Sequence, residues 1–325
     1  MSKPIVLMAL ELDPRHKVLG MKQLEGLASV HYLDELSEEA FDGLIPEVEI
    51  LVRYGIHKPF PDEAFSRMTR LRLIQAMSAG TRFLEVDPAI PDHVMIQGAR
   101  GANSAAVAEQ AMAHLLASAK TLSQHDRMIR NKLFDQRGTT KCLAESKIGV
   151  FGLGSIGTEI AKRALAFEMD VLAIDLVKST QLPVSFLGGM EDIDRVLPEI
   201  DFLVLSLPLT DETKGIIGQC ELSQMKEAAC LINVGRGALV DQRALYEHLA
   251  AHPEFRAGLD VWWKYPTTYP TELIESHWDY PYDYPFHLLD NVIMTPHMAA
   301  YSGQARDRMF DVVIARLREY LSAHS

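Results

Sequence analysis

The chain of 325 residues has only three cysteines, Cys142, Cys220 and Cys230, and no two of them form a CxxC pair. An odd, widely spaced set of this kind predicts neither a disulfide framework nor a zinc site, and it is typical of a reducing compartment. We therefore expect a cytoplasmic protein without a bound metal.

Long apolar runs are also missing. The first residues, MSKPIVLMAL, hold too short an apolar stretch for a signal peptide, and no stretch approaches the roughly 18 residues of a membrane-spanning helix. Positive charge is scarce, because 44 acidic residues against 32 lysines and arginines give a net charge of −12. Such a chain repels phosphate backbones and anionic lipid, so neither nucleic acid nor a membrane is an expected partner.

What the chain does contain is 48% hydrophobic residues, arranged in two successive blocks of short apolar runs. This length and composition suffice for two ordinary domains. Strands are predicted at 4–10, 29–33, 48–55, 71–77 and 93–99, and then at 147–152, 171–175, 201–208, 229–235, 255–261 and 291–297. Because helical spacing separates the strands, we predict two doubly wound α/β units, each a parallel sheet with helices on both faces.

Two long helices and one irregular segment complete this prediction. Residues 103–130 are expected to form a single helix, with Ser104 as its cap and Leu122 on its apolar face, and residues 302–322 an amphipathic one. Residues 262–285 hold all three tryptophans and four Tyr-Pro pairs. Such proline density excludes a long helix or a central strand and predicts a loop pinned by aromatics. We favour a lid or a subunit contact for this loop, and a pocket wall for a bulky substrate is the alternative.

The strongest local signal is KIGVFGLGSIG, a predicted strand that runs into Gly152, Gly154 and Gly157. In a dinucleotide-binding turn the first glycine permits the tight bend, the second lets a pyrophosphate approach, and the third allows close packing of the helix. The helix start then offers N–H groups to the phosphates, whereas the alternative is a glycine-rich turn without a ligand. Asp175, at the end of the next strand, would accept from the ribose hydroxyls and repel a 2′-phosphate. We therefore favour NAD over NADP. Lys178 is the one nearby residue that favours NADP.

Two further strand ends carry candidate catalytic groups. Arg236 lies between glycines in LINVGRGALVD, and its guanidinium suits a carboxylate or a polarised carbonyl. His297 follows the strand in VIMTPHMAA, and imidazole titrates near neutral pH, as general acid/base catalysis requires. Taken alone, the arginine would more often form a surface ion pair and the histidine would more often be a satisfied buried group. Both nevertheless follow strands whose carboxyl ends line the ligand crevice of a doubly wound sheet.

The segments FGLGSIG, SLPLTDETKGIIG, LINVGRGALVD, AGLDV and TPHMAA occur in the order seen in the D-isomer-specific 2-hydroxyacid dehydrogenases. The chain resembles this family over nearly its full length, most specifically over 103–300. The resemblance implies a Rossmann NAD-binding domain at 104–297, inserted into a flavodoxin-like substrate domain of 1–103 plus 298–325. It implies hydride transfer between NAD(H) and a small 2-hydroxyacid or 2-ketoacid. It also implies a homodimer, with the 103–130 helix and the connection after it as the contact.

The resemblance also assigns roles to residues. Arg236 would bind the substrate, His297 would exchange a proton with the carbonyl oxygen, and Asp260 would hold the nicotinamide carboxamide. Further cofactor contacts are implied for Gly152, Gly154, Ser155, Ile156, Gly157, Asp175, Ser206, Leu207, Pro208, Asn233, Val234, Gly235 and Ala299. Substrate contacts are implied for Arg53, Ala79 and Gly80, with Tyr54 and His57 facing the same cleft.

One position departs from the family pattern. The family usually has a glutamate five residues after the aspartate of LDV, where it hydrogen-bonds the catalytic histidine, and this chain has Tyr265 there. A carboxylate raises the pKa of a neighbouring imidazole, and a phenol does not. We therefore expect Tyr265 to orient His297, as part of the catalytic set, and His297 to be less basic than is usual in the family. In two alternatives, Asp279 or Asp283 supplies the carboxylate, or Tyr265 only packs in its loop.

The altered position leaves a second class of function open, a dinucleotide-sensing or corepressor-like binding protein with weak catalysis. The retention of Arg236 and His297 favours an enzyme. The sequence does not identify which 2-hydroxyacid is the substrate, because discrimination depends on loops that the motifs do not place.

Overall fold

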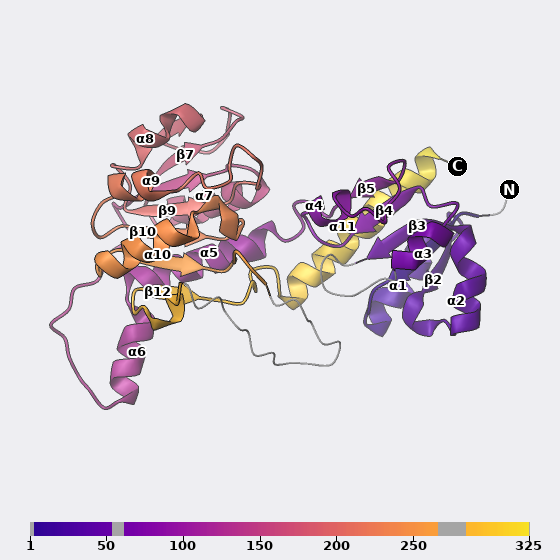
Figure 1. Cartoon of the computed structure of the whole chain (residues 1–325), viewed down its shortest axis with the longest axis horizontal. Coiled ribbons are helices and arrows are strands. Elements are labelled where there is room, and N and C mark those ends of the chain that lie inside the picture. Colours follow the sequence, from indigo (N-terminus) through magenta and orange to yellow (C-terminus); the bar gives the residue numbers. More distant parts are fainter. Residues whose placement is uncertain (1–2, 54–61, 266–283, 325) are drawn as a thin grey trace. The chain divides into compact units, whose positions relative to one another are not determined.

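The computed structural model describes residues 3–53, 62–265 and 284–324, and the chain divides into two compact units (Figure 1). The first unit comprises the described residues up to Asn103 together with those from Gly303 onward. The second comprises the described residues from Ser104 to Ser302. Each unit has its own parallel sheet and its own buried apolar clusters.

The first unit is built on a five-stranded parallel sheet in the order β2-β1-β3-β4-β5. Its strands are β1 (Ile5–Ala9), β2 (Ser29–Tyr32), β3 (Val48–Arg53), β4 (Leu73–Ala76) and β5 (Met95–Gln97). Its helices are α1 (Pro14–Leu24), α2 (Glu38–Leu44), α3 (Asp62–Arg67), α4 (Arg82–Glu85) and α11 (Gly303–Ala323), with short turns η1 (Leu33–Glu35) and η2 (Ile45–Glu47). This strand order is that of flavodoxin-like folds, as predicted.

The last helix belongs to this first unit although it is the end of the chain. Phe310, Val313 and Ile314 of α11 are buried and pack with β1 and α1 in one apolar cluster. Burial of such side chains contributes roughly 1.5–3 kcal/mol each. Gly20 of α1 permits the contact, because a Cβ at this position would lie 2.8 Å from the Tyr32 hydroxyl and 3.2 Å from Phe310. The amphipathic helix predicted at 302–322 is therefore confirmed.

The second unit contains a seven-stranded parallel sheet in the order β12-β11-β10-β9-β6-β7-β8. Its strands are β6 (Lys147–Phe151), β7 (Asp170–Ile174), β8 (Phe186–Gly188), β9 (Phe202–Leu205), β10 (Cys230–Asn233), β11 (Arg256–Leu259) and β12 (Val292–Met294). Its helices are α5 (Ser104–Ala119), α6 (Leu122–Arg130), α7 (Ser155–Ala166), α8 (Ile193–Val196), α9 (Gln219–Gln224) and α10 (Gln242–Ala251), with turns η3 (Met190–Asp192), η4 (Gly237–Leu239) and η5 (Phe286–Leu288). The strand order reverses at β6 and β9, as in a Rossmann fold, so the carboxyl ends of these strands are the expected ligand crevice.

The single helix predicted over 103–130 is wrong, since α5 ends at Ala119 and α6 begins at Leu122. Thr121, between them, has a left-handed φ of 50°, which does not continue a right-handed helix. A later segment of the chain satisfies a backbone carbonyl at the end of α5, because the Lys141 N–H donates to the Ala119 carbonyl at 2.9 Å. Leu122, expected on the buried face, is 53% exposed.

The predicted cap at Ser104 is also wrong. Ser104 is itself the first helical residue of α5, and its buried hydroxyl has no hydrogen-bond partner among the described residues. Among the same residues, none of the helices combines the length and the apolar character needed to span a bilayer.

Candidate active site

The glycine turn after β6 uses its three glycines for different reasons. Gly152 has a left-handed φ of 91°, and a Cβ there would lie 2.8 Å from the Leu207 nitrogen. At Gly157 a Cβ would lie 1.8 Å from the Gly152 carbonyl oxygen. Gly154 is exposed, and a Cβ there would meet no atom within 4 Å. Packing of the chain therefore demands the first and third glycines, whereas the middle one leaves its backbone open to a ligand.

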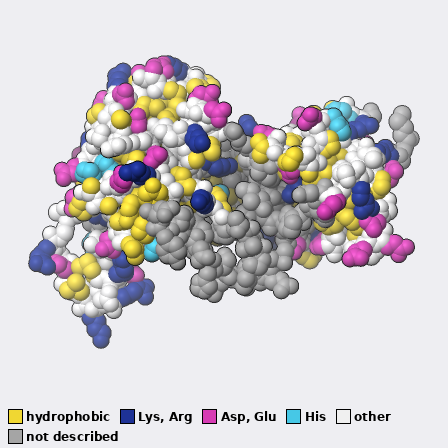
Figure 2. Space-filling view, viewed as in Figure 1, with side chains coloured by type: hydrophobic (Ala, Val, Ile, Leu, Met, Phe, Trp, Pro, Cys, Tyr) yellow, Lys and Arg dark blue, Asp and Glu magenta, His cyan; other side chains and the backbone are white. Residues whose placement is uncertain are grey.

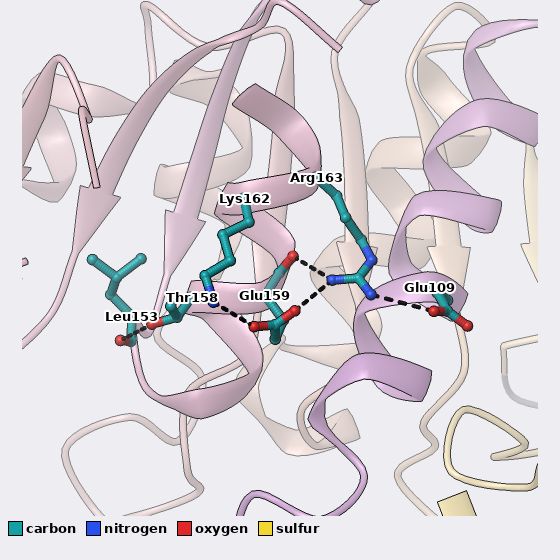
Figure 3. A network of polar contacts seen from close by, with 6 residues as sticks. All are labelled: Glu109, Leu153, Thr158, Glu159, Lys162 and Arg163. Atoms are coloured by element: carbon teal, nitrogen blue, oxygen red, sulfur yellow. Dashed lines mark hydrogen bonds and ion pairs between the residues drawn. The ribbon is translucent and has the colours of Figure 1, made fainter. Parts of the chain in front are cut away.

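Helix α7, which begins at Ser155, is tied to α5 by an ion network (Figure 3). The labelled residues are Glu109, Leu153, Thr158, Glu159, Lys162 and Arg163. Arg163 donates to the Glu159 carboxylate at 2.7 Å and to Glu109 of α5 at 3.2 Å. Hydrogen bonds from Lys162 and Arg163 lower the pKa of Glu159. The network holds the start of α7, whose first N–H groups lack helical acceptors, beside the glycine turn.

Asp175, directly after β7, is hydrogen-bonded to the glycine turn. Its carboxylate accepts from the Leu153 N–H at 2.6 Å and from the Val177 N–H at 2.8 Å. Lys178, the residue that argued for NADP, lies 2.5 Å from Glu191, and this contact raises the pKa of Lys178. Because an acid already pairs with Lys178, the surroundings of Asp175 favour an unphosphorylated ribose.

The other predicted cofactor contacts lie at the carboxyl ends of β9 and β10. They are Ser206, Leu207, Pro208, Asn233, Val234 and Gly235. The Ser206 hydroxyl donates to the Gly152 carbonyl at 2.7 Å, which joins β9 to the glycine turn across the point of strand reversal. The Asn233 amide donates to the Arg236 carbonyl at 2.8 Å and accepts from the Gly235 N–H at 3.1 Å. Asn233 thus shapes the turn that carries Arg236.

The glycines on either side of Arg236 allow close packing of that turn. A Cβ on Gly235 would lie 2.8 Å from the Leu239 side chain, and one on Gly237 would lie 2.3 Å from the Trp262 backbone. The Arg236 side chain is exposed, and its guanidinium donates to the Gly235 carbonyl at 2.7 Å. A rigid turn therefore presents a fixed positive charge at the carboxyl edge of the sheet.

His297 lies in a strained turn just after β12. Its φ of 57° is left-handed, which costs a residue other than glycine about 1 kcal/mol or more. Its N–H donates to the Thr295 carbonyl at 3.0 Å, and its side chain is half-buried. The ring centroid of Tyr265 lies 5.5 Å from that of His297, and the Tyr265 hydroxyl accepts from the Trp262 N–H at 3.2 Å. The structure thus places Tyr265 beside the histidine, and its catalytic role remains a prediction.

Asp260, directly after β11, is fully buried. Its Oδ1 lies 2.5 Å from the Thr295 hydroxyl and accepts from the Met298 N–H at 2.9 Å. Its Oδ2 accepts from the Ala299 N–H at 3.0 Å. All three partners flank His297 in the sequence. The predicted contact with a carboxamide stays a prediction, and the structure gives Asp260 a second task, which is to hold the His297 turn.

Sequence reasoning missed Thr295, Trp262 and His114. The Trp262 indole donates to the Thr295 carbonyl at 3.0 Å, and the Thr295 hydroxyl lies 3.0 Å from the His114 ring. The Thr-Pro-His triplet was a usable signal, since it places a hydroxyl two residues before His297. His114 gave none, because a lone histidine on the apolar face of a helix usually belongs to the core.

The predicted substrate contacts lie in the first unit. Arg53 ends β3, with its guanidinium 5.9 Å from the centroid of the Phe65 ring. After β4, the Ser78 hydroxyl donates to the Gly80 carbonyl at 2.8 Å. The neighbouring turn is close, because a Cβ on Gly98 would lie 2.8 Å from the carbonyl oxygen of Ala79. Tyr54, His57, Asp279 and Asp283 lie outside the described residues.

The family model described as "D-isomer specific 2-hydroxyacid dehydrogenase, NAD binding domain" matches residues 112–299. A hydroxypyruvate reductase from Thermotoga maritima is 32% identical over 302 residues, which cover 92% of each chain. A glyoxylate reductase from Pyrococcus horikoshii is 30% identical over 310 residues, covering 92% of this chain and 88% of the relative. A crystal structure of D-lactate dehydrogenase from Aquifex aeolicus shares the fold, with a TM-score of 0.72 at 23% identity over 98% of this chain and 96% of that one.

Proposed function

Because the chain belongs to the D-isomer specific 2-hydroxyacid dehydrogenases, its reaction is hydride transfer between NAD(H) and a 2-hydroxyacid/2-ketoacid pair, and we propose that Arg236 and His297 carry it. The second unit is the NAD-binding domain of this family. We assign the first unit, with Arg53, Ala79 and Gly80, to the substrate. Residues 1–103 together with the C-terminal helix then form the substrate domain.

The residues of the second unit fit a dinucleotide. Gly154 leaves its backbone open, the start of α7 supplies N–H groups, and the Asp175 carboxylate lies beside the turn where a ribose would follow. The paired charge of Lys178 supports NAD as the cofactor. When bound, the reduced nicotinamide supplies the hydride.

In the direction of reduction, the work of the chain is binding and proton donation. Arg236 holds the substrate carboxylate and polarises the carbonyl, which stabilises the negative charge that develops on the oxygen. His297 in its imidazolium form gives its proton to that oxygen and ends neutral. In oxidation the neutral ring removes the hydroxyl proton. Tyr265 would keep the imidazole in position without adding charge.

One observation carries this assignment, namely the left-handed backbone of His297. Buried Asp260 holds that conformation through hydrogen bonds from the two residues after His297 and from Thr295. Strained residues of this kind cluster at active sites, where the surrounding structure fixes them. A histidine with only a packing role does not require such a turn.

For the substrate we propose a small 2-ketoacid such as hydroxypyruvate or glyoxylate. The relatives of those names align over 92% of this chain. In a chain with a net charge of −12, a small anion needs a local cation, and Arg236 would supply it. We propose a cytoplasmic location, because all three cysteines are free thiols.

The test is NADH oxidation with a panel of 2-ketoacids. With the best substrate, His297→Asn is expected to lower kcat about 10²- to 10⁴-fold, because general acid catalysis contributes that much. Arg236→Lys is expected to raise KM strongly, since an ammonium lacks the bidentate fork. Arg243→Lys, an exposed arginine paired with Glu247 at 2.7 Å, is the matched control and should behave as the wild type. NADH binding without turnover of any ketoacid would instead indicate a dinucleotide sensor.

We also propose that the chain forms a homodimer through α6. This helix contains no buried residue, and basic and hydrophobic side chains gather together over it (Figure 2). Its apolar residues and those just after it are unusually exposed, with Leu122 at 53%, Ile129 at 59%, Leu133 at 53% and Phe134 at 77%. Large exposed apolar patches mark interaction sites.

A further inference from the structure

Behind the His297 turn, a buried histidine of α5 is joined to the residues that follow β11 and β12. His114 is 2% exposed, and its Nε2 lies 3.0 Å from the Thr295 Oγ1. That hydroxyl lies 2.5 Å from the Asp260 Oδ1, and Gln110 of α5 donates to it at 3.2 Å. Asp260 in turn holds the two backbone N–H groups that follow His297. The contacts therefore form an unbroken path from α5 to the strained turn.

The direction of these hydrogen bonds follows from the chemistry of the groups. A threonine hydroxyl has one proton, and an ionised carboxylate only accepts. Thr295 therefore donates to Asp260 and accepts from the Nε2–H of His114. Burial lowers the pKa of His114, against the opposite effect of Asp260, and thus favours the neutral ring. The Nδ1 of His114 then carries no proton, and it has no hydrogen-bond partner among the described residues.

A histidine at this place needs a reason. An unpartnered ring nitrogen in the core destabilises the fold, and a leucine would avoid this cost. Strand β11 also accommodates the ring through Gly258, where a Cβ would lie 2.8 Å from the His114 Cβ. A leucine could make neither contact of the His114 Nε2, which lies 3.0 Å from the Thr295 hydroxyl and 3.3 Å from the Gln110 amide nitrogen.

We propose that His114 is a positioning residue, which holds His297 through Thr295 and Asp260. The inference rests on the proposed function in one respect, that His297 is the proton donor. The chain lacks a carboxylate at position 265, but it has one behind the turn, and that carboxylate accepts from the N–H groups of the two residues after His297. Together with Gln110, His114 fixes the orientation of the Thr295 hydroxyl and hence the position of the Asp260 oxygen that holds the Met298 N–H.

The test compares variants that remove or keep each donor. His114→Leu and Thr295→Val remove the hydrogen bond, whereas His114→Gln and Thr295→Ser retain a donor or a hydroxyl. We expect the first pair to lower kcat for 2-ketoacid reduction at least tenfold while the Kd for NADH changes less than twofold. The second pair should recover most of the lost activity. The His114→Leu variant should unfold at the same temperature as the wild type or higher, because it removes the unpartnered nitrogen.

A second readout does not depend on turnover. In protein labelled with carbon-13 histidine, His297→Asn identifies the Cε1 resonance of His297. This resonance should move or broaden in His114→Leu and Thr295→Val. In Thr295→Ser it should return toward its wild-type position. An unchanged resonance together with kcat within twofold of the wild type would overturn the inference. Equal losses of NADH binding, activity and melting temperature would overturn it as well, in favour of a packing role. If the wild type binds NADH but reduces no ketoacid, the proposed function fails, and the resonance alone decides about His114.

Discussion

At the scale of single residues, the ring contact and the negative charge near His297 come from two different side chains. Tyr265 lies beside the His297 ring, 5.5 Å between centroids, and brings no charge. Asp260 brings the charge, but its three hydrogen bonds go to Thr295 and to the backbone after the histidine. Asp260 therefore holds the turn, and the side chain beside the His297 ring is a neutral one.

This separation predicts the effect of Tyr265→Glu on the pH profile of kcat. A carboxylate beside imidazole stabilises imidazolium, so it raises the pKa of His297. Reduction needs the protonated ring, which means that activity persists below that pKa and is lost above it. The alkaline limb should therefore move upward by about one pH unit, the size of shift that one neighbouring charge produces.

Tyr265→Phe is the matched control for that measurement. It removes the hydroxyl that accepts from the Trp262 N–H and leaves the charge near His297 unchanged. Its kcat should fall, whereas its alkaline limb should stay within a few tenths of a pH unit of the wild type. Coincident limbs for Tyr265→Glu and Tyr265→Phe would contradict the assignment of Tyr265 to the ring.

Residues that lie in short sequence motifs could be predicted, whereas residues that depend on contacts between distant parts of the chain could not. Gly152, Asp175 and His297 are readable because each follows a strand within a short motif. His114 and Thr295 are 181 positions apart and meet only because α5 packs against β11 and β12. No pattern along the chain encodes that contact, so the positioning path behind His297 required the fold.

At the scale of elements, the longer strands could be predicted, whereas a helix break and a short edge strand could not. The eleven predicted strands are present because short apolar runs between polar helical segments are typical of buried parallel strands. The break between α5 and α6 was not predictable, because it depends on the Lys141 N–H, which reaches the end of α5 from 22 residues further on. Strand β8 was missed because it has three residues at the edge of the sheet.

The element that begins at the glycine turn gives a pair of contrasting substitutions. Gly154→Ala adds a methyl group where no atom lies within 4 Å, so the fold and the melting temperature should be unchanged. Binding of NADH should weaken at least tenfold, because the methyl group occupies the approach of the pyrophosphate. Gly157→Ala places a Cβ 1.8 Å from the Gly152 carbonyl oxygen, so it must push α7 away from β6.

For Gly157→Ala we therefore expect the free energy of unfolding to fall, because overpacking a buried site costs about 1–3 kcal/mol or more. We also expect NADH binding to be lost. Thermal unfolding and fluorescence titration with NADH measure the two effects. Unaltered NADH affinity in Gly154→Ala would mean that the dinucleotide does not pass over this turn.

At the scale of the whole molecule, the exposed apolar residues of α6 predict the oligomeric state. Light scattering should give twice the 36.3 kDa of one chain for the wild type. Phe134→Glu places a charge on a residue that is 77% exposed and should yield a monomer with an unchanged melting profile. Val18→Glu, at 68% exposure on α1 of the first unit, should remain dimeric. A monomeric wild type would refute the dimer.

The two units also differ in their optical probes, which makes their stabilities separable. None of the three tryptophans falls in residues 1–103 or 303–325, so tryptophan fluorescence does not report on the first unit. Trp262 and Trp263 belong to the second unit and are anchored there, with Trp263 stacked on Phe286 at 5.5 Å. Circular dichroism, in contrast, follows the helices of both units.

NADH at a hundred times its Kd should therefore stabilise the unit that the tryptophans report. Binding to the folded state alone contributes about 2.7 kcal/mol at that concentration. For a unit of this size, 1 kcal/mol corresponds to roughly 2–4 °C, so the fluorescence transition should rise by roughly 5–10 °C. The part of the dichroism change without a fluorescence counterpart should keep its midpoint. In Gly154→Ala, which binds NADH at least tenfold more weakly, the fluorescence midpoint should rise by no more than about half as much as in the wild type at the same NADH concentration. A fluorescence midpoint that stays fixed while NADH is bound would place the dinucleotide outside the second unit, because a ligand held there has to shift the equilibrium between the folded and unfolded forms of its own binding site.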